Sequence, residues 1–201
     1  MARRAHSEPG TKTRLLDAAE RLMLAKGFGA TSVDEICHAA KLTKGSFFHY
    51  FDSKERLGQE LLDRFCSTGR QLHQRCCGNE RDPLKRIYRY IDAVARLAQD
   101  STRRNGCLLG GFAQELCDTH PGMRSACEQG FNAWARQFAE ELTRAKARYV
   151  PNASFRPWEL AEHFIATLEG SLLLGKARND MTVVAQNLRH FKAYVRTLFK
   201  R

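Results

Sequence analysis

Long apolar runs are missing from this chain. Its longest apolar stretches, around residues 107–113 and 171–175, are short and rich in glycine, whereas a membrane-spanning helix needs about 20 consecutive apolar residues. The first residues carry charge but have no apolar stretch behind them, so they do not resemble a secretory signal. We therefore expect a cytoplasmic protein that makes no use of a membrane.

The signatures of several enzyme classes are also absent. The sequence has no Gly-x-Ser-x-Gly nucleophile elbow, no phosphate-binding P-loop and no glycine run of the dinucleotide-binding type. Its histidines do not assemble into a catalytic set. We therefore do not expect an enzyme, and no cofactor is implied.

The cysteines show neither a disulfide nor a metal-binding pattern. There are seven, an odd number, and without an export signal a disulfide framework is not expected. No Cys-x-x-Cys pair occurs, and the best candidate for a metal site is Cys76-Cys77 with His73. Adjacent cysteines rarely chelate one ion together, so we interpret these as ordinary helix-end residues and predict no metal site.

Patterns typical of β-strands are lacking as well, because no segment alternates β-branched and polar residues. Apolar residues instead recur every three or four positions, and residues that favour helix starts punctuate them. The expected caps and helix-starting prolines are Ser32, Thr43, Ser53, Pro83, Pro121 and Pro157. We predict an all-α chain of about nine helices.

Acidic residues are outnumbered by basic ones. The chain has 33 Lys and Arg against 22 Asp and Glu, giving a formal net charge of +11 and an isoelectric point near 9.6. This balance favours a polyanionic partner, usually nucleic acid. The basic residues are spread along the chain, so charge alone does not locate a binding surface.

Residues 32–51 carry the most informative pattern. Two short capped helices across a tight turn are typical of a helix-turn-helix, whose second helix can enter the major groove of DNA. Phe47 could meet a thymine methyl group there, and Lys54, at the start of the next helix, could meet a phosphate. The predicted DNA contacts are Ser32, Thr43, Lys44, Gly45, Ser46, Phe47, His49, Tyr50 and Lys54.

Residues 31–57, TSVDEICHAAKLTKGSFFHYFDSKERL, resemble the DNA-binding domain of TetR-family transcriptional regulators. The motif similarity covers about residues 11–60, and the remainder resembles the family only in helix count and in its terminal helix pair. The resemblance implies a three-helix DNA-binding domain, residues 1–54, and a helical ligand-binding and dimerisation domain, residues 55–201. It also implies a repressor that leaves its DNA operator when a small molecule binds.

The chain departs from the family at two positions. It has Lys41 where the family usually has a glycine in the turn, and a non-glycine residue in a left-handed turn costs about 1 kcal/mol. It has Phe48 where the family usually has a tyrosine, and the hydroxyl that would meet a phosphate is missing. We therefore leave Phe48 out of the predicted contacts.

Two other functions remain open at this point. One is a cysteine-based redox or detoxifying enzyme built on Cys107. The absence of a catalytic framework weighs against this enzyme. The other is a helical adaptor that keeps a degenerate helix-turn-helix without binding DNA. Lys44, Tyr50 and Lys54 weigh against the adaptor, because a purely structural helix pair does not require them.

The last two helices carry apolar residues at alternating spacings of three and four. Such a seam packs against another helix, either within the chain's own core or across a homodimer. A homodimer is expected because a palindromic operator has two half-sites, each read by one subunit. Leu173 and Leu174 lie off the seam, so one face could meet the chain's own domain and another a second subunit. The predicted dimer interface is Trp158, Ile165, Leu168, Leu172, Val184, Leu188, Phe191 and Val195.

The middle helices are expected to hold a small-molecule effector of unknown identity. Aromatic residues there could line an apolar pocket or fill a solid core. Cys107 follows Arg103-Arg104-Asn105-Gly106 at a helix start, which would favour a reactive thiolate, and this stretch resembles a subgroup of TetR-type repressors that includes sensors of electrophiles. A small residue filling a tight corner, or neutral pocket lining, are the alternatives. The predicted effector residues are Cys107, Phe112, Phe131, Trp134, Phe138 and Phe164.

Overall fold

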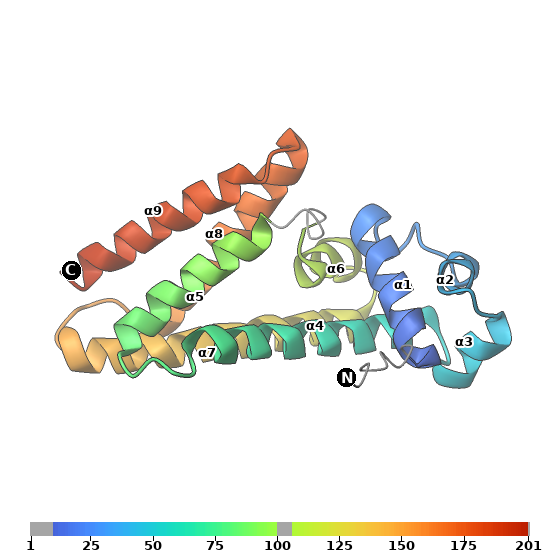
Figure 1. Ribbon diagram of the computed structural model, residues 1–201, viewed down its shortest axis with the longest axis horizontal. Coiled ribbons are helices and arrows are strands. Elements are labelled where there is room, and N and C mark those ends of the chain that lie inside the picture. Colours follow the sequence, from blue (N-terminus) through green and yellow to red (C-terminus); the bar gives the residue numbers. More distant parts are fainter. Residues whose placement is uncertain (1–9, 100–105, 201) are drawn as a thin grey trace, which may run out of the picture.

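The computed structural model describes residues 10–99 and 106–200. Over these two stretches the chain forms nine α-helices and no strand, as predicted (Figure 1). The helices are α1 (Thr11–Lys26), α2 (Val33–Ala40), α3 (Lys44–Tyr50), α4 (Lys54–Cys77), α5 (Pro83–Ala98), α6 (Leu108–Leu116), α7 (Pro121–Tyr149), α8 (Pro157–Arg178) and α9 (Thr182–Leu198).

The helix boundaries follow the predicted caps. Ser32 accepts from the amide of Glu35, whose carboxylate in turn accepts from the Ser32 amide, so the capping box is formed. The side chains of Thr43 and Ser53 cap α3 and α4 by accepting from the amides of Ser46 and Arg56. Prolines begin α5, α7 and α8. Lys41 takes the left-handed conformation with φ 55°, as expected of the turn between α2 and α3.

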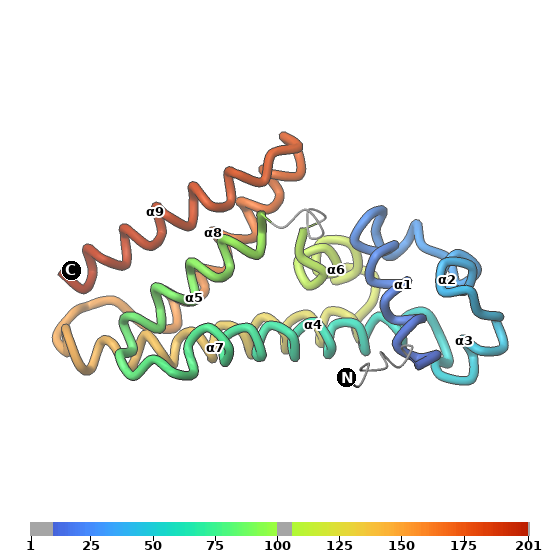
Figure 2. Tube along the Cα trace, viewed as in Figure 1, coloured from blue at the N-terminus to red at the C-terminus, as the bar shows by residue number. Residues whose placement is uncertain are grey.

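The molecule is elongated, and its two ends differ (Figure 1). Helices α1, α2 and α3 gather at one end, while α5, α8 and α9 form the other. The long helices α4 and α7 run side by side along the molecule and join the ends (Figure 2). Helix α6 lies between the ends and packs against α1, α4 and α7.

Two clusters of buried apolar side chains hold these parts together. The N-terminal core joins α1–α3 to the first half of α4, to α6 and to the start of α7. The distal core joins α5, α7, α8 and α9 with the last residue of α4. Fully buried side chains of the N-terminal core include Phe47, Phe51, Phe112 and Leu57, and those of the distal core include Phe138, Phe164, Phe199 and Ile91.

The first half of α4 therefore packs with the helices before it, although the predicted domain boundary falls at its first residue, Lys54. The division of the chain into domains between residues 54 and 55 remains a proposal.

Within the described ranges, no helix is long and apolar enough to cross a membrane.

Candidate nucleic-acid interface and effector cavity

The turn between α2 and α3 is held by a hydrogen bond within the turn and by another from α1. The amide of Leu42 donates to the carbonyl of Cys37 at 2.9 Å. From α1, Arg14 donates through Nη2 to the carbonyl of Ala40 at 2.6 Å. These contacts set the angle between α2 and α3, which decides how α3 is presented to a partner.

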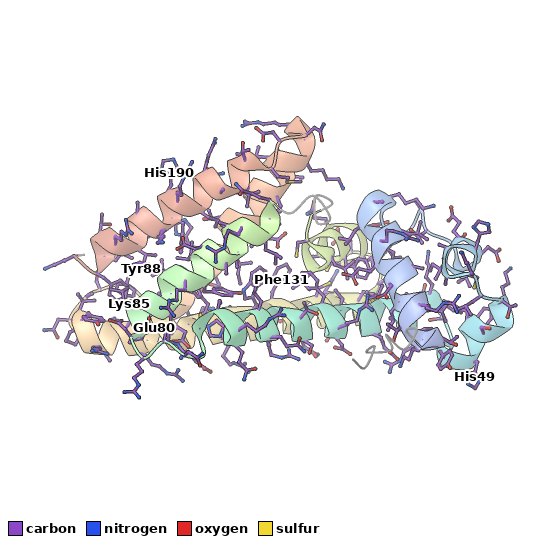
Figure 3. The ribbon with its side chains drawn as sticks, in the orientation of Figure 1. His49, Glu80, Lys85, Tyr88, Phe131 and His190 are labelled. Atoms are coloured by element: carbon purple, nitrogen blue, oxygen red, sulfur yellow. The ribbon has the colours of Figure 1, made fainter. Side chains whose placement is uncertain are left out.

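One face of α3 is open to solvent at the end of the molecule. Thr43, Lys44, Gly45, His49 and Tyr50 are exposed, and His49 projects away from the rest of the fold (Figure 3). This face carries a positive charge, hydrogen-bonding side chains and a slim first turn, which together suit contacts with base edges and phosphates.

The polar groups around this face also have structural partners. Lys44 pairs with Asp34 at 2.8 Å, while both side chains remain exposed. The hydroxyl of Thr43 accepts from the amide of Ser46 at 3.2 Å, and the two hydroxyls lie 3.1 Å apart. Ser32 is exposed and caps α2. The contacts of these residues with DNA remain predictions.

The placement of Phe47 against a thymine methyl is wrong. Phe47 is fully buried and packs against Phe51, with their ring centroids 5.6 Å apart. In a helix of seven residues only one face can meet the core, and Phe47 lies on it. Phe48, the next residue, is 54% exposed, so it is the phenylalanine that α3 presents to a partner.

Lys54 is held against the protein itself. Its ammonium donates to the carbonyls of Phe28 and Thr31 at 3.0 and 2.9 Å and lies 4.4 Å from the centre of the Phe28 ring. The structure thus gives Lys54 a positioning role, joining the start of α4 to the loop between α1 and α2. Its contact with a phosphate remains a prediction.

The same loop is held from the other side by α6. The carboxylate of Glu115 accepts from the amides of Phe28 and Gly29 at 2.7 and 2.6 Å. A side chain at Gly27, whose φ is +90°, or at Gly29 would collide with this carboxylate. Sequence reasoning missed Glu115, because a contact between residues so far apart leaves no local signal.

A cavity of about 450 Å³ lies between the two ends of the molecule. It is lined mainly by apolar side chains of α4, α5, α7 and α8, and at its edge Arg64 of α4 is paired with Asp17 at 2.6 Å and with Glu20, both on α1. Inside, Trp134 donates through Nε1 to the hydroxyl of Tyr90 at 2.7 Å. The dimensions and lining suit a small, largely apolar molecule.

Of the predicted effector residues, Cys107 and Trp134 line this cavity. The other four do not line it. Phe138 and Phe164 are fully buried and stack in the distal core, 4.7 Å apart, because neighbouring helices leave no open side. Phe131 lies between the two cores (Figure 3), and Phe112 belongs to the N-terminal core.

A second cavity of about 370 Å³ lies between the end of α1, α6 and α8. Phe112 and Cys107 line it, together with the charged residues Glu115, Glu169 and Lys176. Cys107 thus borders both cavities, at the N-cap of α6.

The reactive Cys107 thiolate remains a prediction, and the described surroundings of Cys107 oppose it. Burial raises the pKa of Cys107 well above its usual value, and the nearby carboxylate of Glu169 raises it further. The amides of Leu109 and Gly110 oppose this but do not outweigh it. Arg103 and Arg104, which were expected to favour the thiolate, lie outside the described residues. Burial also raises the pKa of Glu169.

The apolar seam of α8 and α9 packs within the chain. Six of the residues predicted at a dimer interface are buried in the distal core, and Leu172 lies partly buried against that core and lines the first cavity. The six are Ile165, Leu168, Val184, Leu188, Phe191 and Val195. The seam faces α5 and α7 because these helices cover it.

Large apolar side chains also remain exposed on α8 and α9. On α8, Trp158, Leu173 and Leu174 are 38%, 56% and 42% exposed, and Tyr194 on α9 is 44% exposed. Spacing predicts that a stripe is buried, and it does not predict which partner covers it. Trp158 alone among the predicted interface residues is exposed.

Among the residues that the structure describes, no three His, Cys, Asp or Glu side chains are grouped to hold a metal ion.

Comparison with known proteins agrees with this geometry. Residues 15–61 match the family model of bacterial regulatory proteins of the tetR family, and residues 83–190 match that of the LmrA/YxaF-like transcriptional regulator C-terminal domain. The chain is 29% identical over 196 residues to the transcriptional repressor NemR of Escherichia coli K12, covering 96% of this chain and 97% of NemR. It is 31% identical over 167 residues to the transcriptional regulator AcuR of Cereibacter sphaeroides, covering 81% of this chain and 74% of AcuR.

Solved structures give the same result. The reduced form of E. coli NemR superposes with a TM-score of 0.79 at 27% identity, covering 91% of this chain and 95% of that one. A regulatory protein TetR from Rhodobacter sphaeroides superposes with a TM-score of 0.78 at 27% identity, covering 92% and 98%. The exposed α3, the helical body behind it and these matches lead to one conclusion: the chain belongs to the TetR family and is a DNA-binding transcriptional regulator.

Proposed function

We propose that this regulator is a repressor that binds a palindromic operator as a homodimer and leaves it when a small molecule enters the cavity between α4, α5, α7 and α8. The observation that carries the proposal is the open face of α3, with Lys44, His49 and Tyr50 at the end of the molecule. We expect the protein to act in the cytoplasm, where its DNA would be.

The DNA-binding part is tested by selecting bound sequences from random duplex DNA and then measuring affinity at several salt concentrations. Lys44→Ala should lower affinity and reduce the slope of log affinity against log salt by about one, because one phosphate contact is lost. Lys85→Ala is the control, since Lys85 is an exposed lysine on α5 far from α3 (Figure 3). Equal slopes for Lys44→Ala and the unaltered protein would place the phosphate contact elsewhere.

For the dimer, we propose that the exposed face of α8 and α9 pairs with the same face of a second copy. Trp158, Leu173, Leu174 and Tyr194 support this, because a monomer rarely exposes so many large apolar side chains on two neighbouring helices. Two such helix pairs would form a four-helix bundle. A dimer would also present two α3 helices to two half-sites of one operator.

Two charged substitutions separate this interface from the chain's own core. Leu173→Glu should give a folded monomer that has lost operator affinity, because Leu173 is exposed in one protomer. Leu188→Glu should fail to fold, because Leu188 is fully buried in the distal core. Sedimentation and circular dichroism measure both, and a Leu173→Glu protein that stays dimeric would contradict the proposed interface.

The effector part rests on the lining of the first cavity. A small apolar molecule with one polar group fits it, since the Trp134 and Tyr90 pair offers a hydrogen-bonding site in apolar surroundings. Leu97→Trp should fill the cavity and weaken ligand-induced release while DNA binding persists. Lys85→Trp, on the exposed side of the same helix, is the matched control. Release that is unaffected by Leu97→Trp would place the effector site elsewhere.

A further inference from the structure

The last two residues of α4 bring two thiols together. The sulfur atoms of Cys76 and Cys77 lie 3.3 Å apart. Each also has a carbonyl partner: the Cys76 thiol donates to His73 and the Cys77 thiol to Arg86, both at 3.4 Å. Consecutive side chains of a helix normally diverge, so this close approach of the two sulfurs is a specific feature of the end of α4.

One thiol of the pair can be reached from outside. Cys76 is partly buried and Cys77 is fully buried, so a reagent would meet Cys76 first and Cys77 second. Both residues stand at the C-terminal end of α4, where the chain turns through Gly78 toward α5. Cys77 would become accessible to a small reagent when the last turn of α4 opens locally.

The number of donors decides which ligand suits the pair. Zinc and related ions take about four ligands, and within residues 10–99 and 106–200 no group of three candidate donors is placed to hold a metal ion. A trivalent arsenic atom that carries one organic substituent needs only two thiols. We propose that Cys76 and Cys77 form a binding site for such monosubstituted trivalent arsenicals, of the type R–As(OH)₂.

The reaction balances without an oxidant or a reductant. Each sulfur forms one bond to arsenic and displaces one hydroxide, and each thiol proton leaves with that hydroxide as water. Arsenic remains trivalent, and the product is R–As(SCys)₂ with two molecules of water. Burial and the Cys76 thiol raise the pKa of Cys77 to about 12, so its proton is still on the sulfur at neutral pH and leaves with the displaced hydroxide.

The surroundings accommodate the organic substituent. Cys76 packs against the apolar residues of the distal core. One turn earlier on α4, Leu72 already lines the first cavity, and Tyr90 of α5 lines it as well. An aryl group on the arsenic would therefore find apolar and aromatic side chains beside it, which favours an aryl arsenical over inorganic arsenite.

Cys117 and Cys127 provide the natural comparison. They also lie near each other, since Cys117 contributes to raising the pKa of Cys127. Their sulfurs come from the end of α6 and from α7, so one arsenic atom would have to clamp two helices together. The Cys76 and Cys77 pair imposes no such constraint, because the two thiols belong to neighbouring residues.

The test uses the full-length reduced protein and phenylarsine oxide, which hydrates to C₆H₅–As(OH)₂. Intact mass spectrometry should show one phenylarsenic group per chain with the loss of two protons. The phenylarsenic group should survive an excess of a monothiol such as glutathione. It should be removed by 1,2-ethanedithiol, because a dithiol also forms two bonds to the same arsenic atom. Peptide mapping should place the group on the peptide that contains Cys76 and Cys77.

Single substitutions decide whether the two thiols act together. In Cys76→Ser, the glutathione concentration needed to remove the phenylarsenic group should be lower by about tenfold or more. In the unaltered protein the first sulfur–arsenic bond holds the second thiol close to arsenic, so the second bond forms at high effective concentration. Cys77→Ala should have the same effect, and circular dichroism checks that each variant is folded. Cys117→Ser, also partly buried, should retain the group. Retention by Cys76→Ser, or loss from Cys117→Ser, would overturn the proposal.

Discussion

The DNA-binding end of this molecule is filled and fixed, whereas its middle is hollow. Around α3, Phe47, Phe51 and Leu57 leave almost no surface exposed, and Lys54 and Glu115 hold the loop between α1 and α2 by its backbone. Between α4, α5, α7 and α8 a cavity of about 450 Å³ remains. A helix that reads base edges must keep one orientation, and a cavity that admits an effector must be able to change.

Helix α6 touches both regions, and this explains how a change in one could reach the other. The segment at its start, Gly106 and Cys107, borders both cavities, and near its end Glu115 holds the amides of Phe28 and Gly29. A ligand that displaces the start of α6 would therefore pull on the loop that leads into α2. The rigid end would then move as a unit instead of deforming.

The largest expected effect tests how firmly the DNA-binding end is packed. Phe47→Ala should lower the free energy of unfolding by about 3–5 kcal/mol, because it leaves a cavity in the N-terminal core. Phe48→Ala, next in sequence but 54% exposed, should change it by less than about 0.5 kcal/mol. Chemical denaturation measures both, and similar losses for the two variants would mean that the end is not filled as described.

A smaller effect tests the link through α6. Glu115→Gln weakens two charge-assisted hydrogen bonds to the loop, so we expect about 1–2 kcal/mol less stability. We also expect weaker release of DNA by ligand, since allosteric coupling typically amounts to about 1–3 kcal/mol. Glu128→Gln, an exposed glutamate on α7, is the control. Ligand affinity should be unchanged in both variants, and normal release by Glu115→Gln would exclude this route.

The two regions also differ in how much of them the sequence predicts. The helices and caps of the DNA-binding end follow from local signals, such as the capping box at Ser32 and the cap at Thr43. Which of Phe47 and Phe48 faces inward does not, because adjacent residues of a short helix differ only in what packs against them. The predicted contact of Phe47 failed for this reason.

In the hollow region, prediction from the sequence reaches less far. The spacing of Leu188 and its neighbours correctly predicts a buried stripe, but the covering helices belong to the same chain. Aromatic residues such as Phe138 equally suit a pocket or a core, and they form the core. The environment of Cys107 depends on Glu169, which lies on α8. A tertiary contact of this kind has no signature in the local sequence.

A third prediction concerns Cys107 at the border of the hollow region. Because burial and Glu169 raise the pKa of its thiol, Cys107 should react slowly with iodoacetamide at neutral pH, since the thiolate is the nucleophile. Glu169→Gln removes the carboxylate and should shift the pH profile of alkylation at Cys107 to lower pH. Quantitative peptide mapping across pH measures this. Rapid alkylation of Cys107 in the unaltered protein would instead support the predicted reactive thiolate.

The smallest effect concerns His73, which lies buried on α4 toward the distal core. Its pKa is lowered by burial, and Arg86 and Arg144 lower it further while Glu141 and Glu140 oppose them. The ring of Tyr90 also packs against it.

Since the folded pKa lies below the unfolded one, the unfolded chain binds more protons as the pH falls below about 6.5. The contribution of His73 is therefore complete above that pH and is lost as the pH falls toward the folded pKa. The slope cannot exceed that of one proton, about 1.4 kcal/mol per pH unit. Denaturation of His73→Gln between pH 7.5 and 5 should show a shallower decline in stability than denaturation of the unaltered protein. Parallel declines for His73→Gln and the unaltered protein would show that His73 has the same pKa in both states.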